Sequence, residues 1–324
     1  MKRNLAKEVF LTFDVEGPTE NEDYLPRESA EALLGVLAEL KRFRLTGLFF
    51  ITGTAAERLP QYPEIMELLR SNLIGYHSSS HSIRPRIFEY TDVEDYQQAM
   101  EISMKRETSS IDPHTGNILG EGGIQQLRRI FHSNDVKFFR APFLCWSPPH
   151  MECLKELGFK FDFSTNICDI PVQFKGLTMF PAPTIVDTIS EKVASVVENQ
   201  KRVFPRFLLR KMLTRECTVL LLHPSKLVCP YQVSRRALSR VAFRMLLSEL
   251  SVLRRTGAIV VTPSPKVSSN NLDVKRTDAK KLYTENASIC RRLFGYETKY
   301  MRNHFMKFFG KSVNYRVEDL GKQD

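Results

Sequence analysis

The sequence has no long hydrophobic run. Among its 324 residues, no uncharged apolar stretch reaches the roughly 18 residues that a membrane-spanning helix needs. It also lacks the apolar core of a secretion signal, because the stretch that follows the basic segment 1–7 covers only Val9–Phe13. With 42% hydrophobic and 26% charged residues, its composition is that of a folded globular protein rather than a disordered one. These features together predict a cytoplasmic location.

Cysteine is scarce and scattered. The chain has 6 cysteines, and no two of them form a Cys-x-x-Cys pair. In a chain of this size that pattern predicts reduced, structural thiols rather than a disulfide framework or a zinc ribbon. It agrees with a cytoplasmic compartment.

Acidic residues are depleted in the C-terminal part of the chain. Residues 1–200 contain 21 Lys and Arg against 28 Asp and Glu, whereas residues 201–324 contain 26 against 9. A stretch rich in Pro, Ser and Asn lies at 263–271 and marks a domain end. We therefore expect a catalytic domain over residues 1–265 and a basic, aromatic C-terminal extension over 266–324.

Short apolar runs alternate with segments of helical periodicity, a pattern typical of an α/β protein with a largely parallel sheet. The expected strands are Val9–Phe13, Gly47–Thr52, Ile74–His77, Lys137–Arg140, Phe159–Phe163, Thr218–His223 and Ala258–Thr262. The expected helices are Arg27–Phe43, Tyr62–Ser71, Val93–Glu107, Ile124–Ser133, Pro148–Leu157 and Ser234–Arg255. Segment 108–123 is expected to be an irregular loop. About seven parallel strands separated by helices favour a distorted (β/α) barrel, in which chemistry lies at the C-terminal ends of the strands.

Two acidic residues end the first expected strand. Asp14 and Glu16 stand two positions apart, so both carboxylates lie on one side of an extended chain. That placement suits a metal ligand beside a catalytic base, although a pair of solvated loop acids produces the same pattern.

Two of the chain's 7 histidines follow the third expected strand in a His-x-x-x-His arrangement, His77 and His81. On one helical turn this spacing directs both imidazoles to one face, where they can chelate a divalent ion. Neutral imidazole favours zinc, nickel, copper or iron over magnesium or calcium. Chance pairing is the competing interpretation.

Two further strand ends carry a single functional candidate each. Arg140 begins the run Arg-Ala-Pro-Phe that ends at Phe143, and an arginine there can hold a carboxylate by bidentate hydrogen bonds. His223 ends a wholly apolar strand, where it could serve as a general acid. A surface arginine and a structural histidine are the competing interpretations.

The order and positions of these motifs resemble the polysaccharide deacetylase family, also called the NodB-homology family or carbohydrate esterase family 4. The similar segments are Thr12–Asp14, His77–His81, Arg140–Phe143 and Leu221–His223, and the resemblance covers roughly residues 8–265. It implies a metal-dependent hydrolase that removes the N-acyl group of an amino sugar.

The resemblance also implies roles for single residues. Asp14 would be the general base, and His223 the general acid that protonates the leaving amine. His77 and His81 would hold a divalent metal ion, for which zinc is the expected element. Arg140 would hold Asp14.

Three further assignments complete this expectation. The backbone amide of Phe143 would help to bind the oxyanion. The family's second aspartate, a metal ligand, falls on Val15, so Glu16 is the candidate for the third ligand. The aspartate that orients the arginine has two candidates, Asp162 and Asp169, of which we favour Asp162.

Other functions remain open at this point. A hydrolase of the same fold could act on a small non-sugar amide, or a degenerate family member could bind carbohydrate without catalysis.

The basic residues of segment 201–215 are interleaved with large apolar ones, which suits peripheral contact with an anionic membrane at its inner face. Nucleic acid is a less favoured partner because no recognised binding motif is present, and a solvated basic face is the competing interpretation. We expect a substrate inside the cell, either a small glycoside or a lipid-linked or nucleotide-linked amino sugar. The oligomeric state is not predicted.

Overall fold

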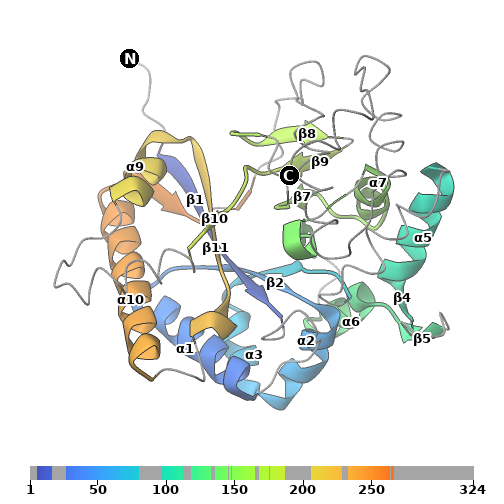
Figure 1. Cartoon of the computed structure of the whole chain (residues 1–324), viewed down its shortest axis with the longest axis horizontal. Helices are drawn as coiled ribbons and strands as arrows, with labels where there is room; N and C mark the ends of the chain where they lie inside the picture. The colour runs from blue at the N-terminus through green and yellow to red at the C-terminus, as the bar shows by residue number, and fades with distance from the viewer. Residues whose placement is uncertain are drawn as a thin grey trace, which may run out of the picture.

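The computed structural model shows a mixed α/β fold whose central sheet curls into a half-barrel, with helices packed around its outer side (Figure 1). The residues that the structure describes are 6–16, 27–79, 96–111, 118–132, 136–144, 146, 148–164, 168–174, 176–186, 206–227, 233–262 and 264–265. The expected C-terminal extension, 266–324, lies outside these residues. In the described part of the chain, no helix is long and apolar enough to cross a membrane.

Strand β1 (Lys7–Val15) organises the sheet because both of its edges are paired. Strand β11 (Cys217–Leu222) lies along one edge. The other edge is shared by β12 (Ile259–Val261), which pairs near the start of β1, and β2 (Leu48–Ile51), which pairs near its end. All of these pairings are parallel, so the C-terminal ends of β1, β2 and β11 meet at one edge of the sheet.

The rest of the sheet extends on both sides of these strands, in the order β10-β11-β1-β2-β3-β6-β7-β9-β8. Only the pairing of β8 with β9 is antiparallel among the described pairings of this sheet. The remaining strands are β3 (Leu73–Tyr76), β6 (Phe138–Phe139), β7 (Phe161–Asp162), β8 (Val172–Phe174), β9 (Leu177–Met179) and β10 (Thr184–Ile185). The expected distorted barrel of mainly parallel strands is therefore confirmed.

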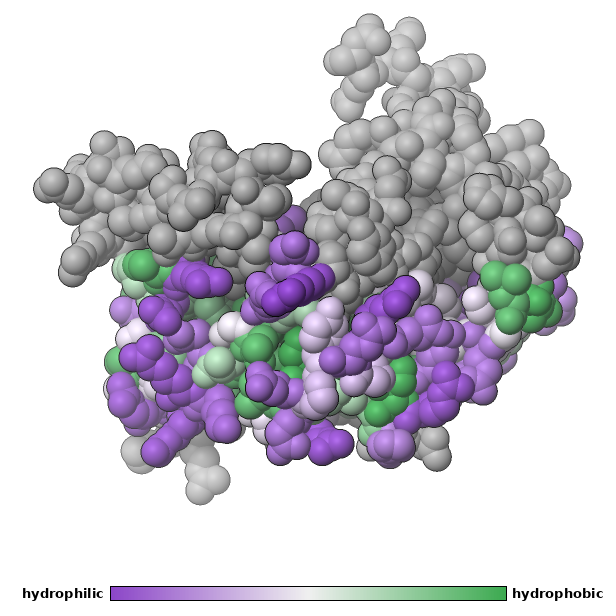
Figure 2. All heavy atoms as spheres, turned by 90° about the horizontal axis from the view of Figure 1, so that it is seen from below, coloured by the Kyte–Doolittle hydropathy of each residue, from purple (hydrophilic) through white to green (hydrophobic). Residues whose placement is uncertain are grey.

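Helices cover the outside of the curled sheet. Figure 1 shows α1, α2 and α3 below it, α9 and α10 beside β1, and α5 and α7 on the opposite side. The helices are α1 (Arg27–Phe43), α2 (Gly53–Arg58), α3 (Pro63–Leu69), α5 (Tyr96–Thr108), α6 (Gly123–Ile130), α7 (Pro148–Glu156), α9 (Arg206–Thr214) and α10 (Val233–Arg255), with the short 3₁₀ turns η1 (Leu59–Gln61), η2 (Pro142–Leu144) and η3 (Pro224–Leu227). The lower face of the molecule carries mainly hydrophilic side chains, with hydrophobic ones in small patches (Figure 2).

Alternation along β1 divides the core into two parts. Val9, Leu11 and Phe13 belong to the large cluster that packs under the helices, and all three are fully buried. Phe10 points to the opposite face and joins a smaller, aromatic cluster inside the barrel. Because side chains alternate along a strand, Asp14 lies on the same inner face as Phe10. The aromatic cluster thus forms the floor below the end of β1.

Every strand and helix expected from the sequence is present, and the bounds of α1 agree to the residue. Two expectations are wrong. Segment 108–123 is not an irregular loop, because Ser109–Ile111 (β4) and Ile118–Glu121 (β5) form an antiparallel hairpin. The first residues of the His-x-x-x-His segment do not form a helical turn, because Ser78 adopts a left-handed conformation with φ of 70°.

The close packing of β2 against β3 yields a matched pair of glycine substitutions. A Cβ at Gly75 would lie 2.6 Å from the Phe50 ring, whereas one at Gly35, on the exposed side of α1, would meet nothing within 4 Å. We expect Gly75→Ala to lower the free energy of unfolding by about 1–3 kcal/mol through overpacking. Gly35→Ala should raise it by about 0.5–1 kcal/mol, because alanine is the better helix former. Urea denaturation of both variants tests this, and equal effects would contradict the packing described for Gly75.

Candidate active site

The candidate residues from distant parts of the sequence meet at the C-terminal edge of the sheet. Asp14 is the penultimate residue of β1, and Glu16 is the first residue after that strand. Asp162 is the last residue of β7. His77, Arg140 and His223 come directly after β3, β6 and β11. His81 lies outside the described residues. The strand-end rule for barrels of parallel strands thus holds for all of these candidates that are described.

A buried ion pair joins Asp14 to Arg140. The Arg140 Nη1 donates to Asp14 Oδ1 at 2.7 Å, and its Nε donates to the Phe163 carbonyl at 3.2 Å. The Arg140 side chain is fully buried, and its guanidinium carbon lies 4.4 Å from the centre of the Phe50 ring. The Arg140 guanidinium needs these partners because an unpaired charge in the protein interior is strongly destabilising. The contact fixes one oxygen of Asp14 and leaves Oδ2 facing the histidines.

His77 is fixed by the backbone of the same arginine. Its Nδ1 lies 2.8 Å from the Arg140 carbonyl oxygen, which can only accept a hydrogen bond, so Nδ1 carries a proton. Its Nε2 lies 3.1 Å from Glu16 Oε2 and 3.8 Å from Asp14 Oδ2. If the ring is neutral, lone pairs on Nε2 and on the Glu16 carboxylate face each other. This contact therefore needs either a proton shared by the two groups or a cation between them.

His223 completes the group from the other side of β1. Its Nε2 lies 3.5 Å from Glu16 Oε1 and 4.0 Å from Asp14 Oδ2. The two histidines therefore approach the same two carboxylates from β3 and β11. His223 is 13% exposed and His77 only 1%, so His223 is the more accessible of the two imidazoles.

The donor set suits a divalent metal ion in its chemistry. A ligand carboxylate and a ligand imidazole, each about 2.0–2.2 Å from one zinc ion, lie roughly 3–3.5 Å apart in tetrahedral geometry. Glu16 and His77 meet that spacing, and the Nδ1 hydrogen bond of His77 is the kind of support that metal-binding histidines have. Within the described ranges, however, no group of three or more His, Cys, Asp or Glu side chains is arranged to hold a metal ion. The expected third partner, His81, lies outside those ranges.

Of the two aspartates expected to orient Arg140, the structure places only Asp162 near it. Asp169 is exposed and pairs with Arg215 at 3.2 Å. Asp162 is fully buried and accepts hydrogen bonds from the Ser164 hydroxyl at 2.6 Å and from its backbone N–H at 3.1 Å. Burial raises the pKa of Asp162 to about 6, against the lowering effects of these two bonds and of the Arg140 charge. No described hydrogen bond joins Asp162 to Arg140, so the two interact through the electrostatic field between their charges.

The segment that carries Phe143 is held by Ser164. The Ala141 N–H donates to the Ser164 hydroxyl at 2.7 Å, and η2, which includes Phe143, begins at the next residue. Ser164 therefore links Asp162 to the chain between Arg140 and η2. Sequence reasoning missed this serine, because nothing in its spacing distinguishes it from an ordinary loop serine.

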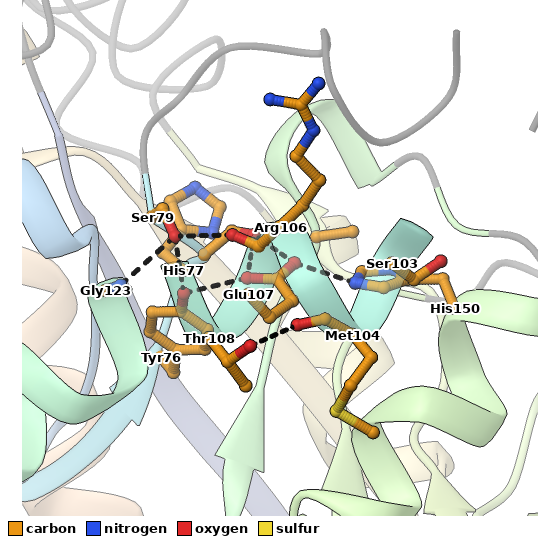
Figure 3. Close-up of polar contacts among 12 residues, drawn as sticks. Tyr76, His77, Ser79, Ser103, Met104, Arg106, Glu107, Thr108, Gly123 and His150 are labelled. Carbon is orange, nitrogen blue, oxygen red and sulfur yellow. Dashed lines mark hydrogen bonds and ion pairs between the residues drawn. The ribbon is translucent and has the colours of Figure 1, made fainter. Parts of the chain in front are cut away.

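A second buried polar group, also missed, lies behind His77. Glu107 accepts hydrogen bonds from Tyr76 (Figure 3) and from Ser78, the two neighbours of His77 in the sequence. His150 lies 2.8 Å from the same carboxylate. The sequence placed Glu107 at the end of the expected helix Val93–Glu107, and only the fold brings it to His77.

The fold and the strand-end residues together define a distorted (β/α) barrel with a carboxylate–imidazole centre at the C-terminal edge of its sheet. No protein-family model and no curated protein matches the sequence.

The chain is similar to several solved structures. One is a protein assigned to the polysaccharide deacetylases from Mycobacterium smegmatis, at 16% identity and a TM-score of 0.49, covering 83% of this chain and 96% of that chain. Another is a family 4 carbohydrate esterase from Streptomyces lividans, at 14% identity and a TM-score of 0.42, covering 82% and 94%. A third is a pseudoenzyme of the same family from Bacillus anthracis, at 15% identity and a TM-score of 0.43, covering 83% and 68%. These structures come from the family whose motifs the sequence resembles, and at such identities the likeness concerns the fold alone.

The raised pKa of Asp162 predicts a specific dependence of stability on pH. The folded chain keeps this proton up to about pH 6, whereas the unfolded chain loses it near the ordinary aspartate pKa of 3.8. Raising the pH through this window therefore favours unfolding, by on the order of 2–3 kcal/mol in total. Asp162→Asn does not titrate, so its free energy of unfolding relative to that of the native chain should rise between pH 4 and 6 and level off above.

Urea denaturation from pH 4 to pH 7 measures this difference. The exposed Asp169→Asn serves as the control and should leave the pH dependence unchanged. A constant difference between Asp162→Asn and the native chain across this range would contradict the assignment.

Proposed function

We propose that the chain is a metal-dependent deacetylase that hydrolyses the N-acyl amide of an amino sugar. The observation that carries the proposal is the placement of Asp14. One of its oxygens is held by Arg140, and the other faces His77 and His223 at 3.8 and 4.0 Å. Amide hydrolysis needs a base for water, a polarised carbonyl and an acid for a poor leaving group. The gathered residues can meet these needs.

In this proposal Glu16, His77 and His81 hold a divalent ion, for which zinc is preferred because two of the donors are imidazoles. When bound, the ion supplies polarisation of the acyl carbonyl and lowers the pKa of a nearby water. Glu16 takes the place that the family usually gives to an aspartate one position earlier. Its longer side chain suits this position, because its carboxylate reaches the Nε2 of His77.

The chemical steps belong to the protein's own groups. Asp14 Oδ2 accepts a proton from water as the water oxygen forms a bond to the acyl carbon. The Phe143 N–H donates to the developing oxyanion, as the sequence resemblance implies. His223 then donates a proton to the amide nitrogen as the carbon–nitrogen bond breaks. The products are the free amino sugar and the carboxylate of the acyl group.

The arginine holds the base in one orientation. A guanidinium hydrogen bond of 2.7 Å limits the rotation of the Asp14 side chain. Ser164, bonded to Asp162, holds the backbone at Ala141, directly after Arg140.

A small non-sugar amide is the alternative substrate, and a binding protein without catalysis is the alternative function. The presence of both a base and an acid candidate around one point favours an enzyme.

A finer part of the proposal concerns the place of the substrate. We propose an intracellular or lipid-linked amino sugar, approached at an anionic membrane surface. Its support is the excess of basic residues in 201–324, of which the exposed Arg210 on α9 is one. Leu208 and Met212 of the same helix are buried, whereas Leu213 is 39% exposed beside the basic residues. Segment 291–311 of the C-terminal extension also interleaves basic and aromatic residues, and it lies outside the described residues.

A comparison of two variants tests the metal and base assignments together. His77→Ala removes one proposed ligand, so the dialysed protein should lose most of its bound zinc and its deacetylase activity. Asp14→Asn keeps an acceptor for Arg140, and it should retain zinc and substrate binding while losing turnover. Metal analysis and acetate release from acetylated amino sugars, with and without chelator, measure both effects. Circular dichroism checks that each variant is folded. Full activity in a metal-free His77→Ala protein would contradict the proposal.

A change of leaving group tests His223. His223→Ala should reduce turnover of an N-acetyl amide by roughly 10²–10⁴-fold, because the departing amine then lacks its proton donor. Hydrolysis of p-nitrophenyl acetate should fall far less, since p-nitrophenolate leaves without a proton. Equal losses on both substrates would show that His223 acts elsewhere in the reaction.

A further inference from the structure

Glu107 is a carboxylate buried behind the candidate site. It lies in the last turn of α5, and its side chain is 1% exposed. Tyr76 Oη donates to its Oε2 at 2.8 Å, and Ser78 Oγ donates to its two oxygens at 2.7 and 2.9 Å. His150 Nε2, from α7, lies 2.8 Å from Oε1. Figure 3 shows the contacts of Tyr76 and His150 with Glu107, and His77 beside them.

The position of Glu107 is costly without these contacts. A negative charge in the last turn of a helix opposes the helix dipole, and burial opposes the charge again. Hydroxyl and imidazole donors that converge on both carboxylate oxygens offset that cost. Two of the four contacts come from Ser78 and one from Tyr76, so most of this compensation is made by the chain on either side of His77.

The geometry of Ser78 explains why the compensation matters locally. Its φ of 70° is in the left-handed region, which a residue other than glycine adopts only when its surroundings hold it. Its hydroxyl is held by Glu107, and its carbonyl accepts from the Gly53 N–H at 2.9 Å. His77, one residue earlier, projects to the other side, toward the Arg140 carbonyl and Glu16.

The next residue is fixed as closely. Ser79 Oγ lies 3.1 Å from Tyr76 Oη and accepts from the Gly123 N–H at 3.2 Å, while the Ser79 carbonyl accepts from the Thr54 N–H at 3.0 Å. A Cβ at Gly123 would lie 2.6 Å from the Ser79 Cα, so the backbone of α6 presses directly on this segment. The segment His77–Ser79 is thus held at several points, and Glu107 provides its charged contact.

We propose that Glu107 is a positioning residue for the metal-binding imidazole of His77. This inference rests on the proposed function. By binding Tyr76 and Ser78, the Glu107 carboxylate fixes the backbone on both sides of His77, and so fixes the direction of Nε2 toward Glu16. His150 completes the support, as the partner from α7. Glu107 touches no reacting atom, and its effect passes through His77.

The affinity for metal separates this role from a general contribution to folding. A residue that only stabilises the fold lowers the melting temperature when it is changed, but the protein that remains folded binds metal as before. A positioning residue weakens metal binding in the folded protein. Changes to residues that support metal ligands typically weaken binding by roughly 10–100-fold.

The experiment is a titration of the metal-free full chain with Zn²⁺ in competition with a chromophoric chelator, below the melting temperature of every variant. Glu107→Gln keeps the size of the side chain but removes its charge. We expect its dissociation constant for Zn²⁺ to rise by roughly 10–100-fold. Ser103→Ala is the matched control, because Ser103 is buried one turn earlier on α5 and its hydroxyl donates to the Ala99 carbonyl at 2.6 Å. Its affinity should stay at the native value.

A second variant covers the case in which Glu107→Gln does not fold. Ser78→Ala removes one hydroxyl and should weaken Zn²⁺ binding in the same direction. A native affinity for Zn²⁺ in folded Glu107→Gln or in Ser78→Ala overturns this inference but not the proposed function. A native chain that binds neither Zn²⁺ nor Co²⁺ contradicts the proposed function, and the inference with it. The absorption spectrum of bound Co²⁺ adds a second readout, since a misdirected His77 should change its intensity.

Discussion

The ion pair between Asp14 and Arg140 is the contact on which the candidate site depends. Asp14 lies near the end of β1 and Arg140 directly follows β6, and these strands are separated in the sheet by β2 and β3. In a flat sheet, strands three positions apart would lie about 14 Å from each other, at about 4.8 Å for each step. A contact of 2.7 Å between their ends therefore needs both the curl of the sheet and the length of an arginine side chain. The half-barrel and the site are thus one structural feature.

The two carboxylates near the buried guanidinium have different partners. Asp14 pairs with it directly, while Asp162 lies near it and binds Ser164 instead. Burial then raises the pKa of Asp162 to about 6, whereas Asp14 keeps its direct contact with the guanidinium. Behind His77, at the end of β3, the buried Glu107 carboxylate is compensated by the Tyr76 and Ser78 hydroxyl groups and by His150. Asp14 and Glu107 are thus held by groups from other elements, whereas Asp162 is held by the residue two positions further along its own segment.

The sequence allowed much of this to be predicted. The apolar runs of β1, β2 and β11 and the periodicity of α1 are strong local signals, and they placed Asp14, His77, Arg140 and His223 at strand ends. What it could not show was set by distant contacts. The two- and three-residue strands β8, β9 and β10 carry too few residues for a pattern, and the short α2 has a low helical signal of its own. Ser164 and Glu107 are ordinary residues until the fold brings them to Arg140 and His77. The left-handed Ser78 was missed because the spacing of His77 and His81 suggested a helical turn.

The central claim is that Glu16 and His77 share one divalent ion beside Asp14. Anomalous diffraction at the zinc absorption edge, from crystals of the full chain grown with zinc, tests it most directly. The account predicts one strong peak about 2.0–2.2 Å from both the His77 Nε2 and a Glu16 carboxylate oxygen. A peak bound to other residues, or a zinc-free site in which Glu16 keeps its contact with His77 alone, would contradict it.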